Sequence, residues 1–173
     1  MNAPLWSLPV PTRGGVYLAH YSATGLAELD FPSAGRARAR TGAVPAGNGA
    51  RRSPPGKVQR WHRATTTALE RVLAGRAAKR LPPLDWAGKT DFQQAVWRAM
   101  LELGPGQTKS YGEIARAIGR PKAVRAVGGA CGANPIPVLV PCHRVLAANR
   151  KIGGFSSGLE RKRELLRAEG VAL

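Results

Sequence analysis

The chain of 173 residues is long enough for one medium-sized domain or two small ones. Its 27 Lys and Arg residues outnumber its 10 Asp and Glu residues, and the net charge of +17 favours a polyanionic partner, either nucleic acid or an anionic membrane surface. Two cysteines alone exclude a disulfide framework and a four-cysteine metal site, and no apolar run is long enough to cross a membrane.

The N-terminal third predicts a small β-structure followed by a basic linker. Residues 1–12 are rich in proline, carry no periodic pattern and predict a loose start. Residues 15–31 form two extended runs separated by a glycine-containing turn at 22–25, which is typical of a β-hairpin. From about residue 33 to 60 the sequence loses periodicity and gains Gly, Pro and Arg, which predicts a flexible basic loop.

A helix and a crossing segment are expected next. Apolar residues at helical spacing predict a helix that starts at Thr65 and ends near Gly75. The proline-containing segment 81–85 predicts an extended crossing, and we place a domain boundary near Gly88.

Three capping-box patterns mark helices in the second half. Thr90, Ser110 and Ser157 are each followed three residues later by Gln or Glu, so that side chain and backbone can cap each other. The helix after Ser157 should end near Ala168, with apolar residues buried and a solvated basic face. Its expected buried residues are Leu159, Leu165 and Leu166, and its expected solvated ones are Arg161, Lys162, Arg163 and Arg167.

The helix after Ser110 is followed by a glycine-containing turn and a second helix over about 122–132, which makes a helix-turn-helix candidate. The second helix has a nearly bare face of Ala and Gly, including Ala126 and Gly128. Small residues allow close approach to another surface, and either DNA or a neighbouring helix explains them.

The most unusual stretch is residues 138–145, where an apolar run delivers Cys142, His143 and Arg144 in succession. A cysteine becomes a nucleophile when a neighbouring base or cation favours its thiolate. A cysteine in an apolar run is also commonly an inert core residue. The rigid Asn134-Pro135-Ile136-Pro137 segment before it and the Gly- and Ser-rich loop after it favour a working nucleophile beside a small pocket.

These motifs resemble the O6-alkylguanine-DNA alkyltransferases, the methylated-DNA–protein-cysteine methyltransferases. The resemblance runs from about Asp91 to Gly170 and is carried by NPIP at 134–137, PCHRV at 141–145 and the glycine-rich loop at 153–158. It implies an α+β protein with a small N-terminal α/β, ribonuclease H-like domain over 1–88. A mostly helical DNA-binding domain with a helix-turn-helix would follow over 89–173.

The resemblance also implies roles for single residues. Cys142 would accept the alkyl group, His143 would take the thiol proton through a water, and Glu169 would orient the imidazole ring. Tyr111 would support a flipped nucleotide and hydrogen-bond its base, and Asn134 would tie the turn beneath the nucleophile.

Contacts to DNA and to the flipped base are implied in the same way. Arg125 would replace the flipped base from within the minor groove. The other residues expected to contact DNA are Lys122, Ala126 and Gly128. The expected pocket residues are Pro137, Val145, Phe155, Ser156 and Ser157. Phe155 stands where relatives commonly have tyrosine, and Ser157 where they commonly have glycine.

The resemblance implies a DNA repair protein that flips O6-alkylguanine, with O4-alkylthymine as a secondary candidate, out of duplex DNA. The alkyl group would pass irreversibly to Cys142, so that each molecule acts once. We expect a cytoplasmic monomer without a metal or cofactor. The alternatives are a non-catalytic alkyltransferase-like protein that only binds the lesion, a Cys-His hydrolase and a transcription factor, and the presence of Cys142 argues against the first.

Overall fold

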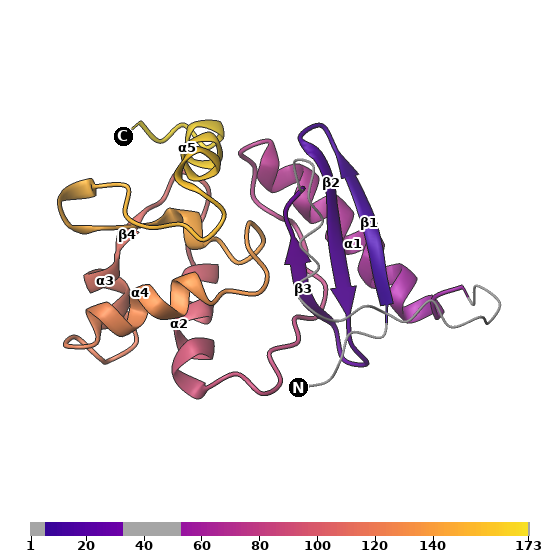
Figure 1. The fold of residues 1–173 in the computed structure, drawn as a ribbon, viewed down its shortest axis with the longest axis horizontal. Helices are drawn as coiled ribbons and strands as arrows, with labels where there is room; N and C mark the ends of the chain where they lie inside the picture. The colour runs from indigo at the N-terminus through magenta and orange to yellow at the C-terminus, as the bar shows by residue number, and fades with distance from the viewer. Residues whose placement is uncertain (1–5, 33–52, 173) are drawn as a thin grey trace.

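The computed structural model describes residues 6–32 and 53–172. It contains a sheet region, made of a three-stranded sheet and helix α1, and a helical region that spans residues 91–172 (Figure 1). None of the described helices combines the length and the apolar character that crossing a bilayer requires.

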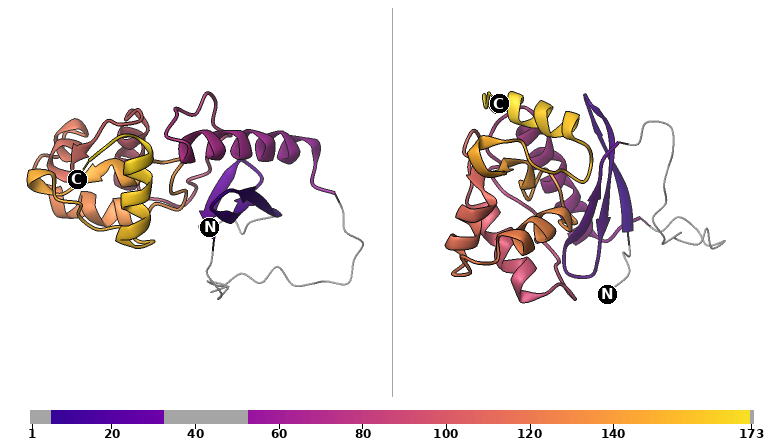
Figure 2. Two further views of the ribbon diagram at one scale, coloured as in Figure 1. Left: turned by 90° about the horizontal axis from the view of Figure 1, so that it is seen from above. Right: turned by 60° about the vertical axis from the view of Figure 1, so that its left-hand side comes forward.

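The sheet region is an antiparallel meander covered by one helix. Strands β1 (Trp6–Thr12), β2 (Gly15–Tyr21) and β3 (Leu26–Asp30) pair in sequence order, and α1 (Gly56–Leu73) lies along one face of the sheet (Figure 2). The Tyr21 hydroxyl donates to Thr65 Oγ1 across this contact at 2.9 Å. The predicted hairpin over residues 15–31 is confirmed.

The expectation of a loose start is wrong for residues 6–12, because β1 pairs with β2 over its whole length, and residues 1–5 lie outside the described residues. Pro9 and Pro11 are two residues apart, so both lack an amide on the same side of the strand. Since β1 is an edge strand of the described sheet, that side can face away from β2 without losing a ladder bond.

Helix α1 also begins earlier than expected. It starts at Gly56, directly after Pro54-Pro55, so Lys57 and Arg60 lie on a helix and not in a flexible loop. Val58 is buried against the sheet and anchors this first turn. The remainder of the predicted basic loop, residues 33–52, lies outside the described residues.

The helical region contains α2 (Asp91–Leu101), α3 (Tyr111–Ala117), α4 (Val124–Gly132) and α5 (Leu159–Ala168). The two-residue strands β4 (Lys109–Ser110) and β5 (Val145–Leu146) pair in parallel, and short 3-10 turns occupy Cys142–Arg144 and Ala148–Arg150. Capping boxes form as predicted at Thr90 and Ser110.

The third predicted capping box is wrong. Gly158, at φ 96°, is the N-cap of α5, and no side chain caps this helix. Leu165 and Leu166 are buried as expected, but Leu159 is exposed, because the helix starts at the surface and enters the core only after its first turn.

Backbone contacts join the two regions. Segment 81–85 runs beside β3, where Leu26 donates to Pro83 O at 2.8 Å and Asp85 donates back to Leu26 O at 2.8 Å. Leu29 donates to Pro135 O at 2.9 Å, which links β3 to the chain before the nucleophile. The buried apolar side chains of both regions form one continuous core.

Candidate active site

A tight, buried turn presents the candidate nucleophile. Asn134 fixes it from both sides, since its Nδ2 donates to Val140 O at 2.8 Å and its Oδ1 accepts from the Ile136 amide at 3.0 Å. Val138 has a φ of 72°, which is a strained conformation for a β-branched residue. The predicted structural tie by Asn134 is therefore present in the geometry, and backbone strain is stored four residues before Cys142.

Cys142 begins the 3-10 turn after Pro141 and is only 5% exposed. Burial raises the pKa of its thiol above the ordinary value, although a hydrogen bond from Asn134 and the nearby charge of Lys162 act in the opposite direction. The resting group is consequently a protonated thiol. The thiol therefore needs a base that takes its proton before the sulfur can act as a nucleophile.

His143 and Glu169 form a buried pair beside the nucleophile. His143 Nε2 lies 3.0 Å from Glu169 Oε1, and the two side chains are 0% and 1% exposed. His143 Nδ1 is buried and has no hydrogen-bond partner among the described residues. Because the carboxylate accepts the Nε2 proton, Nδ1 carries the lone pair and can receive a proton.

Arg144 completes this arrangement. Its Nε donates to both carboxylate oxygens of Glu169 at 3.1 and 3.0 Å, its Nη2 donates to Oε1 at 2.7 Å, and its Nη1 donates to Leu103 O. The Gly106 amide donates to Glu169 Oε2 at 3.1 Å. The carboxylate is thus held by three residues and keeps the imidazole ring in one orientation.

The electrostatics of the pair follow from these contacts. Burial lowers the pKa of His143 below 6.5 despite the hydrogen bond to Glu169, so the ring is neutral at neutral pH. Burial alone would raise the pKa of Glu169, but the hydrogen bonds from His143 and Arg144 outweigh it and lower the pKa to about 2. A neutral base is therefore oriented by a permanent anion.

Lys162 is a site residue that the sequence interpretation missed. We expected a solvated cation, yet this side chain is fully buried and its Nζ donates to Val145 O at 2.7 Å and Gly154 O at 3.2 Å. Burial lowers its pKa to about 8. A signal was available, because Lys162 shares a helix face with Leu165 and Leu166, three and four residues further on.

The glycine-rich segment 152–158, which we call the substrate loop, lies against α3. A Cβ at Gly153 would be 3.1 Å from the Tyr111 hydroxyl, which places the half-buried Tyr111 ring beside the loop. Among the other predicted pocket residues, Pro137 and Val145 are buried, Phe155 and Ser157 are partly exposed, and Ser156 is exposed.

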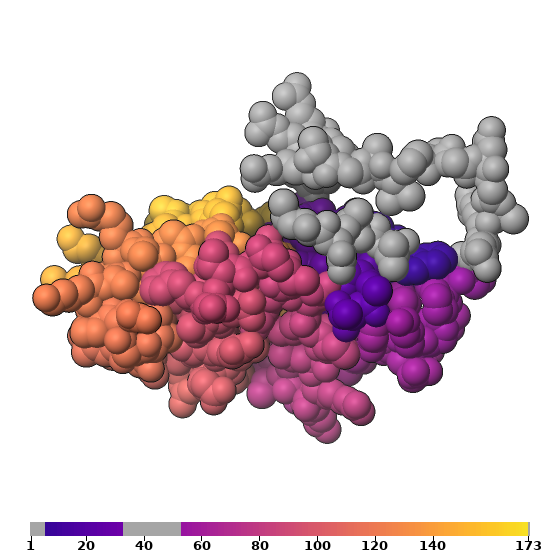
Figure 3. Space-filling view, turned by 90° about the horizontal axis from the view of Figure 1, so that it is seen from below, coloured from indigo at the N-terminus to yellow at the C-terminus, as the bar shows by residue number. Residues whose placement is uncertain are grey.

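The predicted DNA contacts form a second group on α4. Lys122, Arg125 and Ala126 are exposed, and a Cβ added at Gly128 would meet no atom within 4 Å. The segment that contains α4 lies at the end of the molecule remote from α1, on the surface seen in Figure 3. Packing against a neighbouring helix therefore does not account for the glycine at position 128.

The described residues bring together no group of three or more His, Cys, Asp or Glu side chains that could hold a metal ion. The polar side chains around Cys142 are instead paired with one another and with backbone carbonyls.

Sequence comparisons point to one family. The family model for the 6-O-methylguanine DNA methyltransferase, DNA binding domain, matches residues 91–171. The methylated-DNA–protein-cysteine methyltransferase of Haemophilus influenzae is 54% identical over 82 residues, which cover 47% of this chain and 46% of that protein. The protein of the same name from Mycobacterium tuberculosis is 52% identical over 101 residues, or 58% of this chain and 61% of that protein. The chain thus matches about half of the length of these curated relatives.

Solved structures extend the match to the sheet region. The crystal structure of Mycobacterium tuberculosis OGT in complex with DNA superimposes with a TM-score of 0.67 and 36% identity, over 93% of this chain and 90% of that one. The O6-methylguanine-DNA methyltransferase of the archaeon Pyrococcus kodakaraensis, at 24% identity and a TM-score of 0.59, has the same fold. The resemblance inferred from the PCHRV and NPIP motifs is confirmed, and the chain belongs to the O6-alkylguanine-DNA alkyltransferase family.

Proposed function

We propose that this protein repairs DNA by transferring the alkyl group of O6-alkylguanine, and secondarily O4-alkylthymine, to its own Cys142. The observation that carries the proposal is a buried group of four side chains: Cys142 is next to His143, His143 is bonded to Glu169, and Glu169 is bonded to Arg144. His143 is a neutral base with its Nε2 proton fixed on a carboxylate and its Nδ1 lone pair without a partner among the described residues. This is the arrangement that a protonated, buried thiol needs in order to react.

The reaction begins with loss of the thiol proton. His143 Nδ1 accepts it, directly or through one water, and the imidazolium is stabilised by Glu169. Sγ then attacks the alkyl carbon, the S–C bond forms as the C–O6 bond breaks, and the electron pair stays on guanine. Guanine then takes up one proton, which balances the proton that His143 gained and gives up again, and remains in the DNA as the neutral base. The thioether product is stable, so each molecule acts once.

Lys162 supports this step electrostatically. Its cation is coupled to Cys142, so it stabilises negative charge on sulfur as the proton leaves. Its bonds to Val145 O and Gly154 O also fix one side of the base pocket. We assign the flipped base to the space between Pro137, Val145, Phe155, Ser156 and Ser157, with Tyr111 beside its ring. The Val145 carbonyl retains a second lone pair for the guanine amino group.

The DNA-binding part of the proposal rests on α3 and α4. We assign them as a helix-turn-helix whose second helix enters the minor groove, where the small residues Ala126 and Gly128 allow close approach and Lys122 meets phosphate. Arg125 fills the space of the flipped nucleotide. The net charge of +17 favours the polyanion.

The remaining assignments belong to the same proposal. They are a ribonuclease H-like sheet region, a domain boundary near Gly88, a monomeric state and a cytoplasmic location, where reducing conditions keep Cys142 free.

A direct test is to incubate the protein with a duplex oligonucleotide that contains O6-methylguanine and to weigh the protein. We expect a gain of one methyl group per molecule on the Cys142 peptide, and none in Cys142→Ala. Binding without a mass gain would instead identify a lesion-binding protein, and turnover beyond one equivalent would identify a hydrolase.

Replacement of Arg125 with Ala tests the flipping step separately. Arg125 is exposed, so the variant should fold normally. We expect repair of duplex DNA to slow by about tenfold or more, because flipping costs a few kcal/mol, while reaction with a free O6-alkylguanine base is unchanged. Equal losses on both substrates would contradict the assignment of Arg125 to the space of the flipped nucleotide.

A further inference from the structure

An aromatic contact joins the substrate loop to the sheet region. Phe155, in the middle of the loop, packs edge-on against Phe31, with ring centroids 6.0 Å apart and an interplanar angle of 78°. Phe31 follows directly after β3 and packs in turn on Tyr17 of β2, with ring centroids 5.4 Å apart. The loop that carries the predicted pocket residues is therefore in contact with a rigid sheet.

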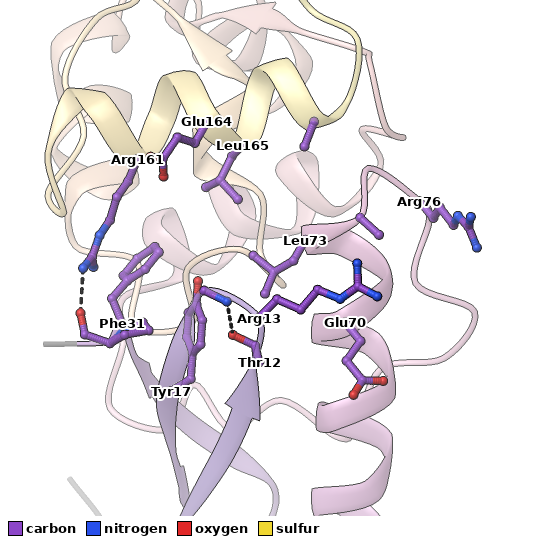
Figure 4. Close-up of a pocket in the computed structure, with 14 residues that line it drawn as sticks. Thr12, Arg13, Tyr17, Phe31, Glu70, Leu73, Arg76, Arg161, Glu164 and Leu165 are labelled. Carbon is purple, nitrogen blue, oxygen red and sulfur yellow. Dashed lines mark hydrogen bonds between the residues drawn. The ribbon is translucent and has the colours of Figure 1, made fainter.

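Arg161 reinforces this contact from α5. Its guanidinium carbon lies 4.8 Å from the centroid of the Phe31 ring, and its Nη2 donates to Pro32 O at 2.6 Å. In Figure 4 the Arg161 side chain extends from α5 towards Phe31 and reaches the backbone beyond it. Since α5 begins directly after the substrate loop, Arg161 connects both the ring and the loop end to the sheet.

A pocket lies beside this contact, between the sheet region and α5. A cavity of about 710 Å³ separates the sheet region from α5, and Figure 4 shows Tyr17, Phe31 and Arg161 at one side of it. Its wall also includes Leu73, Glu164 and Leu165. Across this pocket α5 and the sheet region do not touch, and the contact of Phe31 with Arg161 joins them at its edge.

The loop itself has little intrinsic preference for one conformation. Gly153 and Gly158 adopt φ of 67° and 96°, and Gly154 lies between them. Glycine loses more backbone entropy on ordering than any other residue. Lys162 holds Gly154 O from the side of Cys142, but Phe155 has its aromatic partner in the sheet region.

We propose that Phe31 and Arg161 are positioning residues: they form an aromatic latch by which the sheet region holds the substrate loop closed over the site of the flipped base. This inference rests on the proposed function for its kinetic consequences. When the latch is intact the closed loop is already populated, and the base binds without first ordering the loop. When the latch is broken, only a fraction of molecules is competent and the apparent affinity falls by that fraction.

The kinetic test measures alkyl transfer from a free O6-alkylguanine base over a range of base concentrations. An aromatic pair contributes about 0.5–1.5 kcal/mol, so Phe31→Ala should raise the half-saturating concentration by about 2- to 13-fold. The rate constant at saturation should stay within about twofold, since excess base closes the loop. Phe31→Tyr should restore the wild-type value, and Val16→Ala, an exposed apolar truncation on β2, should have no effect.

A loss of folding would look different. It would lower the fraction of molecules that become alkylated and leave the half-saturating concentration of the others unchanged. Arg161→Gln gives a second test at a partly exposed position, with a smaller shift in the same direction. The double variant Phe31→Ala with Phe155→Ala should be no worse than Phe155→Ala alone, because both changes remove one contact. Unchanged half-saturation in Phe31→Ala, or additive effects in the double variant, would overturn the latch.

Hydrogen exchange separates the latch from the chemistry. Without any substrate, amides of residues 152–158 should exchange faster in Phe31→Ala than in wild type, while those of α2 should not change. If the loop exchanges faster in Phe31→Ala but the wild-type protein transfers no alkyl group, the latch is supported and the proposed function is wrong. If the protein transfers the alkyl group but exchange is equal in both proteins, the proposed function is supported and the latch is wrong.

Discussion

The sheet region and the helical region each contain a histidine bonded to a carboxylate, and the two pairs have the same length. His20 Nε2 lies 3.0 Å from Asp30 Oδ2, and His143 Nε2 lies 3.0 Å from Glu169 Oε1. The surroundings differ. The side chains of the first pair are 14% and 54% exposed and those of the second 0% and 1%.

The Nδ1 atoms of the two histidines show what this difference in burial means. His20 Nδ1 is bonded to Ser7 Oγ at 2.8 Å, so both nitrogens of this surface histidine are occupied. His143 Nδ1 has no partner among the described residues, although it is buried. Burial without a partner is unfavourable for folding and is tolerated where a group has a chemical task. Pair geometry alone therefore does not distinguish the two histidines, but burial and the unsatisfied nitrogen of His143 do.

The most severe way to test this comparison is to neutralise each carboxylate. Glu169→Gln leaves the buried Arg144 cation without its counter-ion, so we expect unfolding free energy to fall by about 3–5 kcal/mol. The alkyl-transfer rate should fall by roughly 10²-fold or more, because the histidine loses its orienting anion. Asp30→Asn should cost about 0–1 kcal/mol and leave the rate unchanged. Denaturant titration and single-turnover kinetics measure both. Comparable losses in the two variants would contradict the distinction.

Acid should reveal how much the buried Glu169 carboxylate stabilises the fold. The pKa of Glu169 is lowered from 4.5 to about 2, so its pairing stabilises the fold above pH 4.5 and this stabilisation disappears as the pH falls towards 2. The loss amounts to about 3 kcal/mol. The lowered pKa of His143 acts in the same direction, beginning below pH 6.5, because the unfolded chain binds that proton first. In Glu169→Gln the free energy of unfolding should depend much less steeply on pH across this range. An unaltered pH dependence in that variant would reject the assignment.

Local patterns explain which elements were predictable. The capping boxes at Thr90 and Ser110 involve residues three apart, so their sequence contains the whole interaction. Strand β1 was missed because prolines usually oppose a strand, and only pairing with β2 makes their positions acceptable.

The site residues also differ in whether local sequence is enough to predict them. Cys142 and His143 are adjacent and were found, and Asn134 contacts residues within six positions. The burial of Lys162 and the contact of Phe31 with Phe155 depend on segments that meet only in the folded protein. A charged residue in a basic helix cannot be distinguished from its solvated neighbours until the packing of that helix is known.

Glycines allow the comparison of the two regions to be extended. In the sheet region a Cβ at Gly25 would lie 2.3 Å from Pro83 O, in the bond that ties β3 to segment 81–85. Gly25→Ala should therefore reduce unfolding free energy by about 1–3 kcal/mol. Gly14→Ala is the matched control, since its Cβ would have no neighbour closer than 3.9 Å. Equal melting temperatures for the two variants would show that the close approach is not required.

Gly128 on α4 should behave in the opposite way and with the smallest effect on stability. A Cβ there meets no atom within 4 Å, and alanine favours a helix over glycine, so Gly128→Ala should raise unfolding free energy by about 0.5–1 kcal/mol. If α4 docks in the minor groove, the added methyl group meets DNA, and duplex affinity at fixed salt should fall roughly tenfold. A loss of stability in Gly128→Ala would show that the glycine is needed for packing within the protein. An unchanged duplex affinity would show that this position does not contact DNA. A gain in stability with a loss of affinity is expected only where the chain forgoes folding free energy to fit a partner outside itself.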